Sequence, residues 1–328
     1  MRAFLISEDD ETLTLEVRDL EAAPEHDQDV LVKVDYSGIN FKDAMVAQLG
    51  SRVRRLPQLI GGVDAAGTVV HSSNAQVPEG TRVAVHGGNL GVARHGGFAE
   101  YVYAPVEFLS VLPQSISNHD AMVIGTAGFT AMASVLALED HGLAAGAEVL
   151  VTGATGGVGS QSVTYLAARG YRPVASTGSL EETPWLIARG ADRVIARDAI
   201  SDKRDRVLGS ELWDGAIDCV GGETLSQVLR VLRYGAAVAA SGLVASPTLA
   251  TTVYPFITRS VALLGIDAVE ARASTRQRVW ATLGETAGSV DFSGLVDRTV
   301  GLDDLVEALD SIRNGQTRGR ILVDPTPG

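Results

Sequence analysis

A glycine-rich turn between a buried strand and a helix constrains the fold of this 328-residue chain more than any other feature. The turn reads GATGGVGS from Gly153 to Ser160, after the apolar run Glu148–Thr152 and at the start of an amphipathic segment, Val158–Arg169. In such a strand–turn–helix unit, backbone N–H groups and the positive end of the helix point at one place. That geometry suits a pyrophosphate.

The glycines of this turn have distinct predicted roles. Gly153 and Gly156 permit a tight turn and a close approach of the backbone to a ligand, and Gly159 lets the helix pack against the sheet. We expect a dinucleotide to contact the middle of the turn, at Thr155, Gly156, Gly157 and Val158. The alternative is a structural turn, but the repetition of strand and helix downstream favours nucleotide binding.

Strands and helices alternate from about residue 123 onward. A helix is predicted at Glu181–Arg189, and further strands are predicted at Pro173–Ser176, Arg193–Ala196, Gly215–Cys219, Ala236–Ser241 and Ser260–Asp267. This alternation indicates a parallel sheet covered by helices. We therefore predict an α/β fold with a doubly wound domain over residues 123–267.

The first 122 residues follow a different pattern, in which glycines separate short β-branched runs as in an irregular β-barrel. The predicted strands are Val30–Tyr36, Ala66–His71, Arg82–Val85 and Ala99–Val102, with one helix at Asn40–Gln48. After residue 268 we predict two helices, at Arg272–Leu283 and Asp303–Asn314, and a final strand at Gly319–Val323. Residues 1–122 and 268–328 are predicted to form one domain, into which the doubly wound domain is inserted.

The end of the second strand of the doubly wound domain bears on the choice of dinucleotide. NAD sites usually place Asp or Glu there for the ribose 2′-OH, whereas this strand ends in hydroxyl side chains at Ser176, Thr177 and Ser179. Hydroxyls accommodate a 2′-phosphate and therefore favour NADP. Glu181 and Glu182 weaken this inference, although negative charge also suits the first turn of a helix. The candidates for a counter-charge are Arg172 and Arg189.

Composition limits the partners of the chain. A formal charge of −13 argues against binding of nucleic acid or anionic membranes. One cysteine, Cys219, excludes a disulfide framework. The N-terminal residues have no basic stretch followed by an apolar run, and no window approaches about 18 uninterrupted apolar residues. We therefore expect a cytoplasmic protein that acts on a small molecule.

An ordered set of short motifs resembles the medium-chain dehydrogenase/reductase superfamily over essentially the whole chain. The motifs are SGINFKDA from Ser37, GGVDAAG from Gly61, GGFAE from Gly96, IGTAGFTAM from Ile124, DCVG from Asp218, SGL from Ser241, PFI from Pro255, and Gly319-Arg320. They are most similar to the zinc-free quinone oxidoreductase branch and, within it, to the acrylyl-CoA reductase group. The resemblance implies a GroES-like catalytic domain and a Rossmann domain.

The zinc ligands of the alcohol dehydrogenases in this superfamily have no counterpart here. Asn40 and Val63 stand where that branch has a cysteine and a histidine, and no cysteine lies near Thr126. Zinc needs three or four ligands within bonding distance, and Asp64 alone cannot hold it. His86 and His95 are the remaining candidates, in a glycine-rich segment where surface histidines are common. We therefore expect no metal.

The resemblance, together with these departures, implies a hydride transfer that needs no Lewis acid. An enone, an unsaturated thioester or a quinone carries its own electron sink, so the protein needs only to position the acceptor and stabilise the enolate. The expected activity is NADPH-dependent reduction of a short α,β-unsaturated acyl-CoA such as acrylyl-CoA. The alternatives are a quinone or enone reductase and a non-catalytic NADPH-binding structural or sensor protein.

The resemblance also nominates site residues, each with a structural alternative. The catalytic candidates are Asn40, Lys42, Asp43 and Arg320. The alternative roles are a helix N-cap for Asn40, a surface lysine for Lys42 and a salt bridge within a strand for Arg320. Asp43 is expected to anchor the loop or to relay a proton. Besides the glycine turn, the cofactor candidates are Thr130, Ser176, Thr177, Ser179, Ser241, Leu243, Phe256, Ile266 and Arg320. Asn40 is also expected to contact the substrate.

Three arginines follow the predicted helix at Asn40–Gln48. Arg52, Arg54 and Arg55 can clamp the phosphates of coenzyme A, since guanidinium binds phosphate in bidentate fashion. The alternative is a solvated loop that balances local acidity. Finally, Ser260–Asp267 has the pattern of an edge strand, so we expect a homodimer, although burial within one subunit explains its apolar residues equally well.

Overall fold

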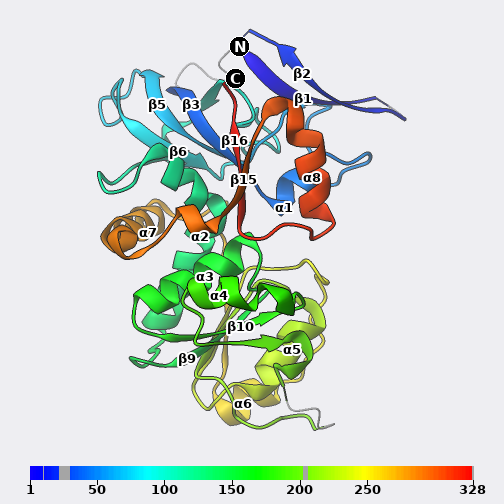
Figure 1. Cartoon of the computed structure of the whole chain (residues 1–328), viewed down its shortest axis with the longest axis vertical. Coiled ribbons are helices and arrows are strands. Elements are labelled where there is room, and N and C mark those ends of the chain that lie inside the picture. Colours follow the sequence, from blue (N-terminus) through cyan, green and yellow to red (C-terminus); the bar gives the residue numbers. More distant parts are fainter. Residues whose placement is uncertain (10, 22–29, 202–205, 327–328) are drawn as a thin grey trace. The chain divides into compact units, whose positions relative to one another are not determined.

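The structure, a computed structural model, describes residues 1–9, 11–21, 30–201 and 206–326. The chain forms two compact units (Figure 1). Unit 1 comprises residues 1–127, 268–287 and 292–328, and unit 2 comprises residues 128–267 and 288–291. The sequence analysis placed the first boundary at 122/123, whereas the structure places it at 127/128, within helix α2 (Asn118–Asp140).

Unit 1 is built on two sheets whose strands pair antiparallel, except that β15 and β16 pair in parallel. Its larger sheet has the order β15-β16-β3-β5-β6-β8, with β7 paired to β3, and a smaller sheet has the order β2-β1-β4. The strands are β1 (Arg2–Glu8), β2 (Leu13–Asp19), β3 (Val30–Ile39), β4 (Gln58–Ile60), β5 (Asp64–His71), β6 (Arg82–His86), β7 (Tyr101–Ala104), β8 (Leu109–Val111), β15 (Val296–Gly301) and β16 (Arg320–Asp324). Its helices besides α2 are α1 (Phe41–Val46), α7 (Ala273–Thr286) and α8 (Leu305–Arg313).

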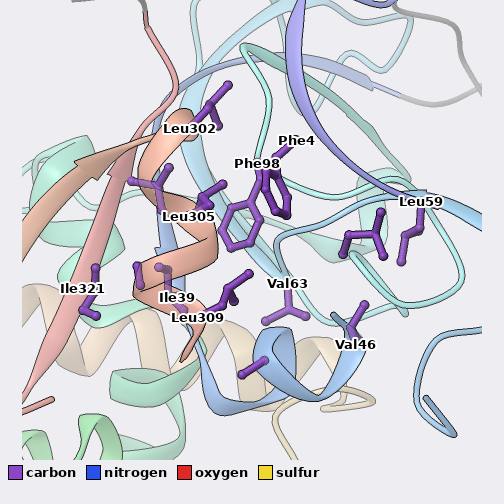
Figure 2. Packing of buried hydrophobic residues seen from close by; sticks show 14 of the residues in the cluster. Phe4, Ile39, Val46, Leu59, Val63, Phe98, Leu302, Leu305, Leu309 and Ile321 are labelled. Carbon is purple, nitrogen blue, oxygen red and sulfur yellow. The ribbon is translucent and has the colours of Figure 1, made fainter. Parts of the chain in front are cut away.

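One apolar core of unit 1 gathers side chains from β1, α1, α8 and β16 (Figure 2). Phe4 and Phe98 meet edge to face with ring centroids 6.3 Å apart, and Leu305 and Leu309 reach the same cluster from α8. Several core residues are sequence neighbours of polar residues that matter below: Ile39 precedes Asn40, Val63 precedes Asp64, and Ile321 follows Arg320. Packing of this core therefore fixes the backbone from which those polar side chains project.

Unit 2 is a six-stranded parallel sheet with the order β11-β10-β9-β12-β13-β14. Its strands are β9 (Glu148–Thr152), β10 (Arg172–Thr177), β11 (Arg193–Ala196), β12 (Gly215–Asp218), β13 (Ala237–Ala240) and β14 (Ala262–Gly265). The strands lie among α3 (Gly157–Ala168), α4 (Thr183–Ala188), α5 (Gly222–Val231) and α6 (Tyr254–Arg259) (Figure 1). The predicted α/β fold, with a β-rich domain and a doubly wound parallel sheet, is confirmed.

Short 3-10 helices link several of these elements. They are η1 (Val106–Phe108), η2 (Leu180–Glu182), η3 (Arg197–Ala199), η4 (Ala287–Ser289), η5 (Ser293–Leu295) and η6 (Leu302–Asp304). Among the residues that the structure describes, α2 alone is long and apolar enough to cross a membrane, and 89% of its most apolar window is buried inside the protein. That burial is the environment of a core helix.

Candidate functional site

A buried ion pair between Asp64 and Arg320 lies at the centre of the candidate site in unit 1. Asp64 begins β5 and Arg320 begins β16, and both strands pair with β3. Arg320 Nη2 lies 3.3 Å from Asp64 Oδ2, and neither side chain is more than 2% exposed. Arg320 Nη1 donates to the carbonyl of Ile39 and to Asn40 Oδ1, at 3.0 Å each. The guanidinium thus joins the ends of three strands.

The Asp64 carboxylate also accepts hydrogen bonds from two other segments. Asn40 Nδ2 donates to it at 2.8 Å, and Thr126 donates through its backbone N–H at 2.9 Å and its hydroxyl at 2.5 Å. The Thr126 N–H is available because α2 is interrupted at Gly125, which has φ +48° and ψ −160°. A Cβ at Gly125 would lie 2.5 Å from Asp64 Oδ2, so the kink requires glycine.

Asp43 is a second buried carboxyl next to this network. Its Oδ2 accepts the Asn40 backbone N–H at 2.7 Å, and its Oδ1 accepts the Val63 backbone N–H at 2.9 Å. Burial, opposed in part by these hydrogen bonds, raises the pKa of Asp43 to about 7, and the Asp64 charge also raises it. Asp43 therefore ties the start of α1 to the segment before β5, and it titrates near neutral pH.

A cavity of about 300 Å³ opens beside this network. It is lined by Asn40, Lys42, Arg52, Val53, Arg55, Val63, Gly87, Asn89, Leu90, Val92, Thr126 and Val269. The two arginines are exposed, whereas Val63, Leu90 and Val92 are at most 8% exposed. The cavity therefore combines a cationic rim with a buried apolar wall, and Asn40 and Thr126 connect it to the Asp64–Arg320 pair.

Arg54 differs from the other two arginines that were predicted to form a clamp. Its side chain is buried, its Nη1 donates to the carbonyl of Val46 at 2.6 Å, and its Nη2 forms an ion pair with Glu8. It does not line the cavity. The physical reason is that a buried guanidinium must satisfy its donors within the protein, so we remove Arg54 from the predicted clamp.

The residues at the position of the alcohol dehydrogenase zinc do not fit that metal. Asn40, Val63 and Thr126 offer no thiolate or imidazole. Asp64 is already paired with a fixed guanidinium, which would repel a divalent cation. His86 is buried next to Arg276, and His95 Nδ1 accepts the backbone N–H of Ile60 at 3.0 Å. The residues that the structure describes contain no group of three His, Cys, Asp or Glu side chains able to hold a metal ion.

The glycine turn in unit 2 has the geometry of an anion site. Gly153 has φ +60°, and α3 begins at Gly157, so the N–H groups of its first turn have no partner within the helix. A Cβ at Gly159 would lie 2.2 Å from the Gly153 carbonyl oxygen, whereas one at Gly156 would be no closer to any other protein atom than 3.4 Å. Gly159 thus serves packing, while Gly156 leaves open space in front of α3.

The carboxyl end of β10 brings together a residue set that the sequence analysis identified only in part. Ser176 and Thr177 are buried, and the Thr177 hydroxyl accepts the Ser179 backbone N–H at 3.0 Å. Thr177 pairs with Ala196 of β11, so the next residues, Gly178 and Arg197, are neighbours. A Cβ at Gly178 would lie 2.6 Å from Arg197 Cζ, which shows that the guanidinium rests on the glycine backbone.

Arg197 was not predicted, although strand register could have found it. The earlier candidates have other contacts: Arg172 begins β10, at the end opposite to Thr177, and Arg189 forms an ion pair with Asp291 at 3.2 Å. Arg197 is exposed, and no ion pair of its guanidinium is found among the residues described in unit 2.

The remaining cofactor candidates lie in α2 and after strands β13 and β14. Thr130 is buried in the part of α2 that belongs to unit 2. The backbone N–H of Ser241 donates to the Asp218 carbonyl at 3.0 Å, and that of Ile266 to the Ala240 carbonyl at 3.0 Å. Leu243 is 52% exposed, whereas Phe256 packs partly against the unit 2 core.

Comparison with known proteins gives matches over the whole chain. The profile described as "Alcohol dehydrogenase GroES-like domain" matches residues 26–114, and that described as "Zinc-binding dehydrogenase" matches residues 157–285. The acrylyl-CoA reductase AcuI of Ruegeria pomeroyi is 41% identical over 298 residues, which cover 90% of this chain and 90% of that protein.

Two solved structures are similar throughout. The YhdH oxidoreductase of Salmonella enterica in complex with NADP is 38% identical, covers 99% of this chain and 100% of its own, and has a TM-score of 0.93. YhfP of Bacillus subtilis carries the name of a quinone oxidoreductase and is 44% identical over 90% of this chain and 89% of its own. Its structure with NAD bound has a TM-score of 0.93 and covers 98% of both chains.

Asp43→Asn should change how stability depends on pH. The pKa of Asp43 in the folded protein is about 7, above about 3.9 in an unfolded chain. The carboxyl therefore favours folding most below about pH 4, and this contribution is lost as pH rises towards 7. Relative to the variant, the wild type should lose up to about 1.4 kcal/mol of unfolding free energy per pH unit in that range.

Urea denaturation at several pH values measures this difference. Asp310→Asn is the matched control, because Asp310 is exposed and pairs with Arg313 on the same helix. Parallel stability profiles for the wild type and Asp43→Asn would show that Asp43 does not titrate near neutral pH.

Proposed function

This chain belongs to the medium-chain dehydrogenase/reductase superfamily, in the branch of quinone oxidoreductases and acrylyl-CoA reductases, and we propose that it reduces short α,β-unsaturated acyl-CoA thioesters with NADPH. Acrylyl-CoA is the substrate we favour. The observation that carries this proposal is a cavity that combines the exposed Arg52 and Arg55, its cationic rim, with a buried apolar wall.

The two parts of the cavity match the two parts of an acyl-CoA. Coenzyme A carries phosphates, which guanidinium groups bind in bidentate fashion. The unsaturated acyl group is small and apolar, and Val63, Leu90 and Val92 offer it a dry surface. A free quinone is uncharged and gains little from a cationic rim, so this feature favours the thioester over the quinone reductase alternative.

The chain's own residues have separable roles in the proposed reaction. NADPH bound at the glycine turn would supply the hydride for Cβ. Lys42 lines the cavity, so its ammonium can stabilise the negative charge that develops on the thioester and donate a proton to Cα. Asn40 and Arg320 hold each other in place through the 3.0 Å hydrogen bond, and Asp43 anchors the start of α1 beside them.

The assignment is tested by assaying NADPH oxidation with acrylyl-CoA, crotonyl-CoA and a benzoquinone side by side. We expect kcat/KM for acrylyl-CoA to exceed that for the benzoquinone about tenfold or more, because charge-assisted contacts contribute about 1.5–3 kcal/mol each. A quinone reductase would instead turn over the quinone without inhibition by CoA thioesters. A non-catalytic protein would bind NADPH and turn over none of the three.

The same assay with the double variant Arg52→Ala/Arg55→Ala tests the rim. KM for acrylyl-CoA should rise about 10- to 100-fold, whereas KM for the benzoquinone should hardly change, since only the thioester carries phosphates. Arg313→Ala, which removes an exposed arginine from α8, serves as the control. Equal changes in both KM values would remove the phosphate clamp from the proposal.

We also propose that Arg197 supplies the counter-charge for the 2′-phosphate of NADPH. Two observations support it: the hydroxyl side chains at the end of β10, and the guanidinium that rests on Gly178. Structures of relatives contain NADP in one case and NAD in another. We therefore expect residues at the end of β10 to determine which of the two dinucleotides binds. An exposed guanidinium at the strand end is suited to that role.

Arg197→Ala should weaken NADPH binding about 10- to 100-fold and leave NADH binding unchanged, because only NADPH carries the 2′-phosphate. Fluorescence titration with each nucleotide measures this effect. Gly156→Ala is the matched comparison: a Cβ there would lie no closer than 3.4 Å to the Gly153 carbonyl oxygen, so the fold should be kept while binding of both nucleotides is lost. If Arg197→Ala weakened the binding of NADPH and NADH equally, Arg197 would not be the residue that recognises the 2′-phosphate.

Finally, we propose that the chain forms a homodimer through β14. This strand is at the edge of the parallel sheet as the structure describes it, and Leu263 on it is 38% exposed. Tyr254 and Ile257 of α6 are also exposed, at 50% and 72%. Such an edge with apolar neighbours favours pairing with a second copy. Light scattering should give twice the 34.3 kDa mass of the chain.

A further inference from the structure

Arg276 is a buried arginine of unit 1 that the proposed reaction does not use. It lies in the first turn of α7 and is 4% exposed. Its guanidinium donates to three backbone carbonyls: to His86 at 3.0 Å, to Val269 at 3.0 Å and to Ala271 at 3.2 Å. These carbonyls belong to the end of β6 and to the segment that precedes α7, which are far apart in the sequence.

The same guanidinium sets the distance between those two segments. Gly87 has φ +82°, and a Cβ there would lie 2.4 Å from both Arg276 Nη2 and the Val269 carbonyl oxygen. The backbone of Gly87 is therefore so close to the guanidinium and to Val269 that a side chain at this position would displace one of them. Gly87 and Val269 both line the 300 Å³ cavity, so Arg276 holds two parts of one cavity wall from behind.

His86 completes the support without adding a second charge. It is fully buried, and burial together with the Arg276 charge lowers its pKa to about 4, so it is neutral at pH 7. Its Nε2 accepts the Trp280 Nε1–H at 3.3 Å, and Arg276 Nη1 lies 3.2 Å from its Nδ1. The Ala268 carbonyl is also hydrogen-bonded to His86. The segment 268–271 is thus fastened to the end of β6 at several points.

We propose that Arg276 is a positioning residue that fixes this wall of the acyl-CoA cavity and thereby sets the affinity for the substrate. The proposal rests on the proposed function of the cavity. Arg276 does not line the cavity itself, so its effect is carried by Gly87 and Val269. Lysine cannot replace it, because one ammonium on a flexible stem cannot hold three carbonyls in the geometry of a planar fork.

Arg276→Lys should raise KM for acrylyl-CoA about tenfold or more with a smaller change in kcat, since a displacement of about 1 Å in a binding site costs up to about 100-fold. The dissociation constant for NADPH should stay within about twofold of the wild type, because the glycine turn belongs to unit 2. Trp280→Phe is the matched control. It removes the hydrogen bond to His86 but leaves the three Arg276 bonds intact, so it should lower the thermal midpoint without raising KM.

Hydrogen–deuterium exchange of the two nucleotide-free variants gives a readout that does not depend on turnover. Arg276→Lys should increase exchange in both 86–90 and 268–271, whereas Trp280→Phe should not increase exchange in both. If Arg276→Lys does not fold, Arg276→Gln, which keeps two N–H donors, takes its place. Unchanged exchange and KM in a folded Arg276 variant would overturn the inference. A wild type without acrylyl-CoA turnover would instead overturn the proposed function and leave the exchange test decisive for Arg276.

Discussion

The buried pair of Asp64 and Arg320 is the interaction on which the rest of unit 1 depends. Removing two charges from water costs several kcal/mol per ion, and only close pairing with additional hydrogen bonds offsets that cost. Here the carboxylate accepts from Asn40 and Thr126, and the guanidinium donates to Ile39 and Asn40. Each of these donors and acceptors must be brought to the pair, which dictates the backbone around it.

Two glycines show how strongly the pair shapes the backbone. A Cβ at Gly38 or at Gly125 would lie 2.7 Å from Arg320 Nη2, so neither position tolerates a side chain without displacing the guanidinium. The kink at Gly125 also releases the Thr126 N–H that α2 would otherwise use. A fixed guanidinium offers positive charge but no exchangeable coordination position. A site built this way suits an acceptor that carries its own electron sink, as in the proposed reaction.

Local sequence patterns predicted the elements of unit 2 better than the assembly of the Asp64–Arg320 site in unit 1. The hydrophobic run predicts the strand Glu148–Thr152, and the spacing of the glycines before a helical pattern predicts the glycine turn. The strand β11 at Arg193–Ala196 was predicted in the same way. By contrast, the sequence singles out Asp64 only as a possible metal ligand, and Thr126 only as a position near which the cysteine ligand of the zinc enzymes is missing. Their roles depend on the pairing of β16, β3 and β5, which joins residues 256 positions apart. The spacing of hydrophobic residues within a short segment carries no information about such long-range strand pairing.

The arginines also show that the sequence alone does not reveal the role of a residue, and burial explains why. Arg52, Arg54 and Arg55 occupy three of four consecutive positions and form one basic cluster in the sequence. In the structure, however, Arg54 is buried and Arg55 is exposed. Burial decides the role, because a buried guanidinium donates to carbonyls and carboxylates of the protein and not to a ligand. Arg54, Arg276 and Arg320 are therefore part of the scaffold.

The exposed Arg52, Arg55 and Arg197 are the arginines that we propose to contact phosphate groups. In a chain with a formal charge of −13, the long-range field repels anions, so phosphate recognition must come from short-range contacts at a few positions. The cavity rim and the end of β10 are the two positions at which we propose such contacts. They belong to different units, so in the proposed function affinity for the acyl-CoA and preference for the dinucleotide would be set independently of each other.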